Sequence, residues 1–310
     1  MSLRPGRPED FTTLLALWAD DVRRGGHDSV PERAWLRRQM GDFDWEARSR
    51  VLEDAAGPQG CVVVLDRPGP AGSVTRVEAV GRSEPDRLRL LRWGLGLSQA
   101  AGAAAAQVWW PRDADTAELR RSGLSQVRAF WRMDRPDLED VPELPLPPGY
   151  RLDVGVDAGL AAETYNRAFA DHWRFLPVFP DHVPSGGSAE ELRLLAVGPR
   201  GDAATVVWST LEHHEVDSRA QPVGLVNVVG TVPRHRRRGL ALAMTAEALR
   251  RLGRLGAASA SLYVDASNPT RAYDLYRRLG FEVGYEYEVF EISWRGSAGS
   301  EPGETSNVIS

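Results

Sequence analysis

A basic turn between two apolar segments is the strongest chemical signal in this chain. Four arginines and a histidine occupy residues 234–238 of a 310-residue protein whose formal net charge is −5. Residues 226–232 suit a buried strand, and residues 240–252 have helical spacing and composition. The first amides of a helix are unsatisfied and carry the positive end of its dipole, so cations placed there indicate a bound anion. Gly239 would let the backbone approach it. The alternative is a solvated basic helix start or a nucleic-acid patch.

The run from Arg236 to Ala241, preceded by Val232 and Pro233, resembles the acyl-CoA signature of the GNAT N-acetyltransferase superfamily. That signature is Arg/Gln-x-x-Gly-x-Gly/Ala at the start of the helix after the fourth strand. The resemblance implies that acetyl-CoA is the co-substrate, with its pyrophosphate on the helix amides and its pantetheine along the strand. The residues implied to bind it are Val229, Gly230, Thr231, Arg236, Arg237, Arg238, Gly239, Leu240, Ala241, Asn268 and Tyr276.

The segment NPTRAYDLYRRLGF, residues 268–281, could supply an acid. It predicts a helix over Pro269–Leu279 with Asn268 as its N-cap, and Tyr276 lies on the apolar face. A phenol could protonate or stabilise the thiolate that acetyl transfer expels. The spacing resembles the last motif of the same superfamily, which implies that Tyr276 is the general acid and that Asn268 lies near the cofactor arm. The alternatives are a core tyrosine and a simple cap, with Tyr273 as a weaker candidate acid.

The general base is not evident. Many members of the superfamily carry a glutamate eleven residues before the signature arginine, where this chain has Leu225. Asn227 shares that strand face and could orient a water in catalysis. The acceptor contacts are expected from Asp171, His172 and Trp173, where the first helix of the second half ends. Other candidates for the base are Asp171 and His172, and also Glu212, His213, His214 and Glu215, which are more typical of a strand end than of a metal site.

The chain consists of two similar halves. Arg135–Tyr150 holds five prolines and four acidic residues, which exclude regular structure. Each half opens with a strand and an amphipathic helix and closes with a helix ending in LRRSGL or YRRLGF. We expect an α/β fold of two tandem GNAT-like domains, each a mixed, mostly antiparallel sheet flanked by helices. The expected parts are a degenerate domain (1–135), a proline-rich linker (136–149), a catalytic domain (150–294) and a disordered tail (295–310).

The first half lacks the motif residues. Aligning Pro85 with Pro233 places Leu91 opposite Gly239 and Trp93 opposite Ala241, which leaves no room for a pyrophosphate. We therefore expect the first domain to be a structural partner without a cofactor site.

Composition restricts the remaining function classes. One cysteine, Cys61, excludes a disulfide framework, and no metal site is expected. No apolar run is long enough to span a membrane, and the acidic balance disfavours nucleic-acid binding. We predict a cytoplasmic monomer or homodimer that transfers acetyl from acetyl-CoA to a small-molecule primary amine in a ternary complex. The alternative is a non-catalytic acyl-CoA sensor or scaffold.

Overall fold

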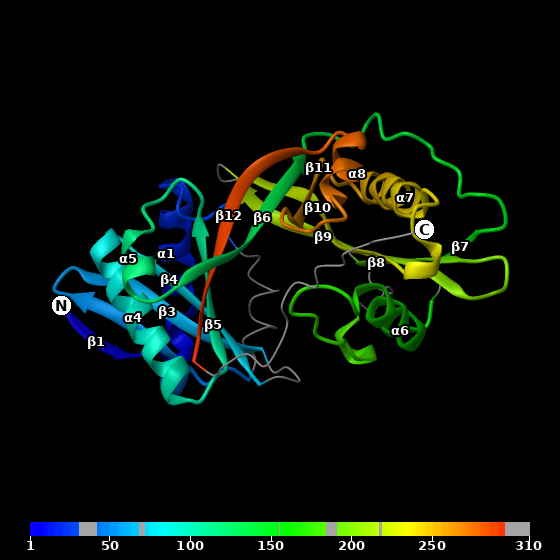
Figure 1. The fold of residues 1–310 in the computed structure, drawn as a ribbon. Helices are drawn as coiled ribbons and strands as arrows, with labels where there is room; N and C mark the ends of the chain where they lie inside the picture. Colours follow the sequence, from blue (N-terminus) through cyan, green and yellow to red (C-terminus); the bar gives the residue numbers. More distant parts are fainter. Residues whose placement is uncertain (31–41, 68–71, 155, 184–190, 217–218, 295–310) are drawn as a thin grey trace. The chain divides into compact units, whose positions relative to one another are not determined.

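The computed structural model describes residues 1–30, 42–67, 72–154, 156–183, 191–216 and 219–294 (Figure 1). The predicted tail therefore lies outside the described residues. Two compact units share the described residues: unit 1 takes 1–29, 42–127 and 288–294, and unit 2 takes Val30 and 128–287, apart from the gaps named above. The prediction of an α/β protein with mixed, mostly antiparallel sheets flanked by helices is confirmed.

Unit 1 is a mixed sheet flanked by helices. Its strands follow the order β1-β2-β3-β4-β5-β12, and β4 and β5 are parallel while the β1–β2, β2–β3 and β3–β4 pairs are antiparallel. The helix α4 packs on β3 and β4 with leucines that are almost fully buried. The elements are β1 (Ser2–Pro5), α1 (Phe11–Arg23), α3 (Trp45–Arg48), β2 (Ser49–Asp54), β3 (Gly57–Arg67), β4 (Val74–Gly81), α4 (Glu84–Ala100), β5 (Ala105–Pro111) and α5 (Ala117–Arg121).

Unit 2 is also a mixed sheet, in the order β12-β6-β11-β10-β9-β8-β7. Within unit 2, β10 and β11 are the only parallel neighbours among the strand pairs whose register is described. The strands β6 and β12 contribute residues to both units. The elements are β6 (Ser125–Arg135), β7 (Arg151–Asp153), α6 (Ala158–Phe169), β8 (Glu191–Val197), β9 (Ala203–Val216), β10 (Arg219–Thr231), α7 (Leu240–Arg254), β11 (Ser259–Asp265), α8 (Ala272–Arg278) and β12 (Glu282–Ser293), with short 3-10 turns η2 (Pro180–His182) and η3 (Pro233–His235).

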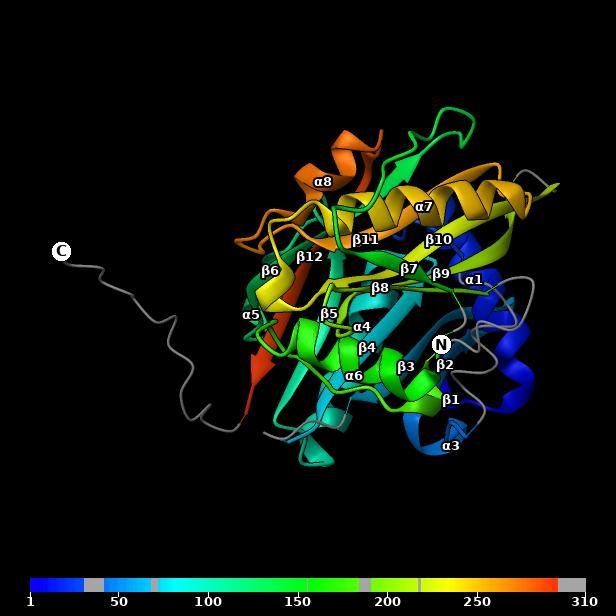
Figure 2. The same cartoon turned by 90° about the vertical axis from the view of Figure 1, so that its right-hand side faces the viewer.

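Strand alternation explains the layers of unit 2. Leu194 and Ala196 of β8 enter the core cluster beneath α7, whereas Leu195 and Val197 enter the cluster beneath α6. Because successive side chains of a strand point to opposite faces, these two helices cover opposite faces of the sheet (Figure 1, Figure 2). The packing of α6 and α7 on these strands thereby fixes the positions of their ends relative to the sheet.

The proline-rich segment 136–149 contains neither helix nor strand. Its apolar side chains nevertheless pack on the core of unit 2: Leu138, Val141, Leu144 and Leu146 contact the cluster beneath α7. The segment is therefore held against unit 2 along much of its length. Within the described residues, no helix is long and apolar enough to cross a membrane.

Candidate functional site

The junction between β10 and α7 exposes a row of backbone amides. After η3, Arg237 and Gly239 adopt left-handed conformations, with φ of 63° and 81°. Within the described chain, the amides of residues 237–242 find no protein acceptor, and Gly239 caps α7 without a side-chain hydrogen bond. Left-handed residues in such a turn direct amides into a concavity, and the dipole of α7 adds positive potential. The junction has the geometry of an anion site.

The four arginines of this turn have different surroundings. Arg234 pairs with Asp202 and lowers the pKa of that carboxyl to about 2. Arg236 is bound to the protein by its whole guanidinium, as described below. Arg237 and Arg238 are exposed and form no ion pair within the described residues, so their charge is available to an anion at the junction. One local motif thus contains both structural and unpaired cations.

Arg236 joins the junction to the end of α6. Its Nη1 and Nη2 donate to the two carboxylate oxygens of Asp171 at 2.7 and 2.9 Å. Its Nη2 also donates to the carbonyl of Ala168 at 2.9 Å, and its Nε donates to the carbonyl of Thr231 at 3.1 Å. The guanidinium lowers the pKa of Asp171. Arg236 was expected to bind the cofactor and Asp171 the acceptor, but in the structure the two side chains form hydrogen bonds with each other.

Strands β10 and β11 separate just before the junction. Their described pairing covers Val223–Val226 of β10, whereas β10 continues to pair with β9 as far as Thr231. The register with β9 shifts between Val226 and Val228, so Asn227 is the extra residue of a β-bulge. The exposed Asn227 amide donates to Thr210 Oγ1 at 3.0 Å. One backbone edge of β10, from Val228 to Thr231, is left without a described strand partner.

The end of α6 packs tightly on this part of β10. A Cβ added at Gly230 would lie 2.5 Å from Cε2 of Phe169 and 3.0 Å from Cβ of Ala168. The Phe169 ring contacts the imidazole of His172 edge-on, with centroids 4.6 Å apart. Burial, assisted by Arg236, lowers the pKa of His172 against the opposing effect of Asp171. His172 is therefore a half-buried imidazole that is neutral at neutral pH.

The next residue of the same segment reaches the end of β11. The Arg128 guanidinium lies 5.1 Å from the centroid of the Trp173 ring, and its Nε lies 3.8 Å from Oδ2 of Asp265. Burial raises the pKa of Asp265, while the Ser267 amide opposes this shift. Sequence reasoning missed Arg128 and Asp265. Asp265 directly follows an apolar strand, and that position was the available signal, whereas nothing local marks Arg128.

Tyr276 lies where the sequence placed it, on the inner face of α8. The residue is 8% exposed, and its ring contacts Phe281 with centroids 6.1 Å apart. Burial raises the pKa of Tyr276 above its usual value, so the phenol stays protonated at neutral pH. Among the described residues its hydroxyl has no hydrogen-bond partner, which leaves it free to donate to a ligand.

Asn268 does not cap α8, contrary to the prediction of a helix from Pro269. Its Oδ1 accepts from the amide and the hydroxyl of Thr270, both at 2.9 Å, which closes a tight turn. Arg271 then adopts a left-handed conformation, and the helix begins only at Ala272. The left-handed residue interrupts the helical hydrogen bonds, which explains the later start.

The matching helix start in unit 1 is closed by its own side chains. Ser83 Oγ accepts from the Asp86 amide at 3.3 Å and donates to the Asp86 carboxylate at 2.6 Å. Glu84 adds a second acid to the first turn of α4, and Leu91 is 2% exposed. Carboxylates already occupy the positive end of this helix, so it offers a poor site for pyrophosphate.

Unit 1 also contains a buried ionic cluster. His27 Nδ1 lies 2.6 Å from Oδ2 of Asp21, and His27 Nε2 lies 3.8 Å from Oε2 of Glu78. The imidazole is 5% exposed and lies beside Trp18. Burial disfavours its charged form, but the two carboxylates outweigh burial and raise the pKa of His27. The cluster therefore holds a charged histidine in the interior.

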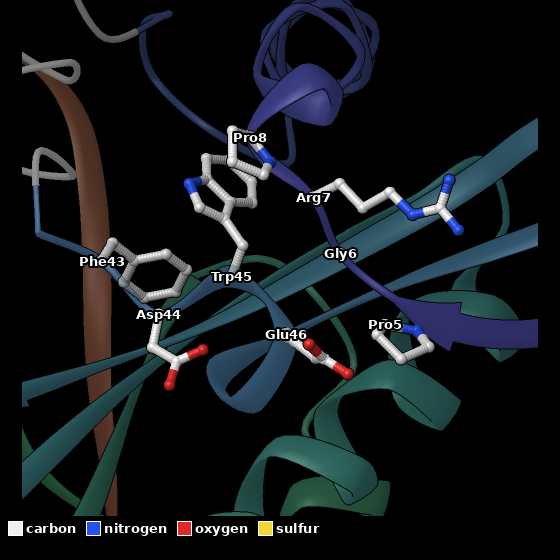
Figure 3. Close-up of a pocket in the computed structure, with 8 residues that line it drawn as sticks. All are labelled: Pro5, Gly6, Arg7, Pro8, Phe43, Asp44, Trp45 and Glu46. Atoms are coloured by element: carbon white, nitrogen blue, oxygen red, sulfur yellow. The ribbon is translucent and has the colours of Figure 1, made fainter.

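A surface cavity of about 490 Å³ lies at a different place in unit 1 (Figure 3). Phe43 and Trp45 meet edge-on there, with ring centroids 5.4 Å apart. Two of its residues have structural roles, since Asp44 caps α3 and the Arg7 backbone amide donates to Asp10 Oδ2 at 2.9 Å in the short 3-10 turn η1 (Pro8–Asp10). The cavity therefore does not belong to the β10–α7 site. No group of three or more metal-ligating side chains is found among the residues the structure describes.

Comparison with known proteins agrees with this geometry. Residues 203–284 match the family model described as an acetyltransferase (GNAT) domain. The mycothiol acetyltransferase of Thermobispora bispora is 33% identical over 88% of this chain and 93% of its own length. That of Salinispora arenicola is 35% identical over 88% of this chain and 90% of its own length.

Solved structures share the fold across both units. A GCN5-related N-acetyltransferase from Sphaerobacter thermophilus has a TM-score of 0.73 and 22% identity, covering 94% of this chain and 95% of that protein. A tandem GNAT protein from the clavulanic acid biosynthesis pathway has a TM-score of 0.70 and 14% identity, covering 94% and 98%. These likenesses establish the architecture.

Proposed function

Because the chain belongs to the GNAT acetyltransferases, which use acetyl-CoA as co-substrate, we propose that it transfers acetyl directly to the primary amine of a small molecule. The transfer takes place in a ternary complex in unit 2. The row of open amides at residues 237–242, flanked by unpaired Arg237 and Arg238, is the observation that carries this proposal.

The junction would hold the diphosphate of the co-substrate. The amides from Arg237 to Ala241, which have no protein acceptor within the described residues, would donate to this anion, and the left-handed Gly239 permits the turn at no steric cost. Arg237 and Arg238 supply positive charge that no protein carboxylate neutralises within the described residues. Leu240 is 1% exposed and anchors the first turn of α7 in the core.

The open edge of β10 would hold the pantetheine arm and the thioester. Val229 and Gly230 lie in the part of β10 beyond its described pairing with β11, so backbone groups there can pair with an extended ligand. An amide of this edge, aimed at the thioester carbonyl, would stabilise the oxyanion that develops in the transition state. The Thr231 carbonyl is already used by Arg236.

Tyr276 would stabilise the departing sulfur. An ordinary thiol has a pKa of about 8.5 and an ordinary phenol about 10, and burial raises the pKa of Tyr276 further. Complete proton transfer to the thiolate is therefore uphill. The hydroxyl instead keeps its proton and donates a hydrogen bond, which is strong when the acceptor is charged.

Direct transfer fits the nucleophiles of the chain. Burial raises the pKa of Cys61 to about 12, so this thiol stays protonated and is a poor nucleophile. Intersecting double-reciprocal plots for acetyl-CoA and amine support a ternary complex, whereas parallel plots would indicate a covalent acetyl-enzyme.

The decisive assay follows free thiol release from acetyl-CoA with a panel of primary amines: amino sugars, amino acids, polyamines and antibiotics. The amine of a mycothiol precursor is tested first, because relatives over most of the chain are named mycothiol acetyltransferases. The rival function is a non-catalytic acyl-CoA sensor. It is favoured by the lack of an ionisable side chain on β10 from Val223 to Thr231. Tight CoA binding with no thiol release for any amine would support the sensor.

A further inference from the structure

An ammonium acceptor must lose a proton before its nitrogen can attack a thioester. On β10, residues 223–231 run VGLVNVVGT and contain no ionisable side chain. The base for the proposed reaction must therefore come from an element packed beside this strand. The end of α6 and the segment that follows it pack on the end of β10 through Phe169 and Arg236.

This segment is held at both ends. On one side, Arg236 binds Asp171 and the Ala168 carbonyl and so ties the segment to the end of β10. On the other side, Trp173 lies against Arg128, whose Nε is 3.8 Å from the Asp265 carboxylate at the end of β11. His172 lies between these two attachments. Its position is therefore close to the end of β10, through its contact with Phe169, and close enough to Asp265 at the end of β11 for the two groups to act on each other electrostatically.

The His172 imidazole is available for proton transfer. Neither ring nitrogen has a hydrogen-bond partner within the described residues, and neither is sealed from the surface. The groups that act on it are Asp171, Arg236 and Asp265, and burial with Arg236 keeps the ring neutral at neutral pH. A neutral imidazole has one nitrogen lone pair that can take a proton.

The neighbouring carboxylates are poorer bases. Asp171 accepts two hydrogen bonds from Arg236, which lowers its pKa and occupies both oxygens. Burial raises the pKa of Asp265, but its Oδ1 already accepts from the Ser267 amide at 2.8 Å and its Oδ2 lies 3.8 Å from Nε of the cationic Arg128. His172 is the group whose proton-accepting atom is free.

We propose that His172 is the general base of the acetyl transfer. Its imidazole nitrogen takes a proton from the acceptor ammonium, and the freed nitrogen lone pair attacks the thioester carbonyl carbon. The C–S bond then breaks, and the sulfur leaves as a thiolate hydrogen-bonded to Tyr276. The nitrogen, which is cationic in the tetrahedral adduct, loses its second proton to water, and the imidazolium also returns its proton to water. This assignment rests on the proposed function.

The test compares His172→Gln with the wild type across pH. Loss of a general base lowers kcat/KM by about 10²–10⁴-fold near neutral pH. Only the free amine can react in the variant, so its kcat/KM rises about tenfold per pH unit up to the pKa of the amine. The deficit therefore shrinks as pH rises. The CoA dissociation constant, measured by calorimetry, stays within about twofold, since His172 lies outside the amide row.

Two further variants separate chemistry from structure. Glu163→Gln is the matched control, because Glu163 is exposed on α6, the helix that precedes His172, and pairs only with Arg167 in the described chain. It should keep the wild-type rate and pH profile. In His172→Ala, added imidazole should restore part of the lost rate in a concentration-dependent way, which a merely misfolded segment would not show.

The outcomes for this assignment and for the proposed function are distinct. If the wild-type protein acetylates no amine, the proposed function fails and the assignment fails with it. If the wild type is active but His172→Gln keeps its rate within threefold and an unchanged pH profile, only the assignment is overturned. Failure of imidazole to rescue His172→Ala also overturns it.

Discussion

Replacing Arg236 with alanine tests whether this side chain binds the protein or the diphosphate. Its two hydrogen bonds to the carbonyls of Ala168 and Thr231 are charge-assisted and part-buried, and each contributes about 1 kcal/mol. The ion pair adds at most about 1 kcal/mol, because the Asp171 side chain is 56% exposed. We expect Arg236→Ala to destabilise unit 2 by about 3 kcal/mol, and Asp171→Asn by less than about 1 kcal/mol.

The functional consequence differs between the two roles. If Arg236 holds α6 against β10, its loss frees the segment around His172, so kcat falls while the CoA dissociation constant rises less than about threefold. If the guanidinium instead contacts the diphosphate, loss of that contact costs about 2–3 kcal/mol, or about 30- to 150-fold in affinity. Hydrogen exchange over residues 160–175 and calorimetry with CoA measure the two effects separately.

Arg238→Ala is the matched control for this experiment. Arg238 is exposed and unpaired within the described residues, so its loss should weaken CoA binding several-fold and leave hydrogen exchange unchanged. A large loss of CoA affinity in Arg236→Ala, with no faster exchange in the end of α6, would refute the structural role of Arg236.

Four further outcomes are expected. Gly230→Ala places a Cβ 2.5 Å from Phe169 and should lower the free energy of unfolding by about 1–3 kcal/mol. Gly96→Ala, at an open helical position, should raise it slightly, and chemical denaturation measures both changes. Tyr276→Phe should lower kcat about 10- to 100-fold and leave CoA affinity within twofold, as measured by thiol release and calorimetry. The raised pKa of His27 contributes stability that is complete below about pH 6.5 and is lost as pH rises through its folded value, so His27→Gln should flatten that decline and cost about 3–5 kcal/mol. Calorimetry should give one CoA per chain, because α4 is capped by its own carboxylate.

Each of these outcomes has a clear contrary result. Equal effects of the two glycine substitutions would contradict the close approach of α6 to β10. An unchanged kcat in Tyr276→Phe would remove the phenol from the reaction. If the free energy of unfolding of the wild type did not change between pH 6 and 9, a charged His27 in unit 1 would be contradicted. Two CoA molecules per chain would show that α4 opens.

The local elements of the site could be predicted from the sequence alone. The apolar run before residue 234 and the helical spacing after residue 239 place a strand-to-helix junction where the structure has one. The period of the last helix puts Tyr276 on its inner face, and the structure buries it. These inferences succeed because strand alternation, helical period and glycine geometry depend on neighbours within a few residues.

The helix boundaries were less accurate for an equally local reason. A capping pattern at Asn268 fits either a helix start or a tight turn, because the same side-chain oxygen accepts amides in both. The choice depends on Arg271, whose left-handed backbone no pattern in the segment indicates.

By itself, the sequence determined the fold class, the duplicated architecture and the strand-to-helix junction before α7, since these follow from periodicity and residue type. Only the tertiary structure decided that Arg236 binds Asp171, 65 residues away, and that the segment around His172 reaches the ends of β10 and β11. It also decided that β6 and β12 contribute to both units. A strand with alternating apolar residues can bury the same face beside any suitable neighbour, and a guanidinium can bind a carboxylate as well as a phosphate. The strand neighbours and the partner of Arg236 are therefore decided by packing between segments that are distant in the sequence.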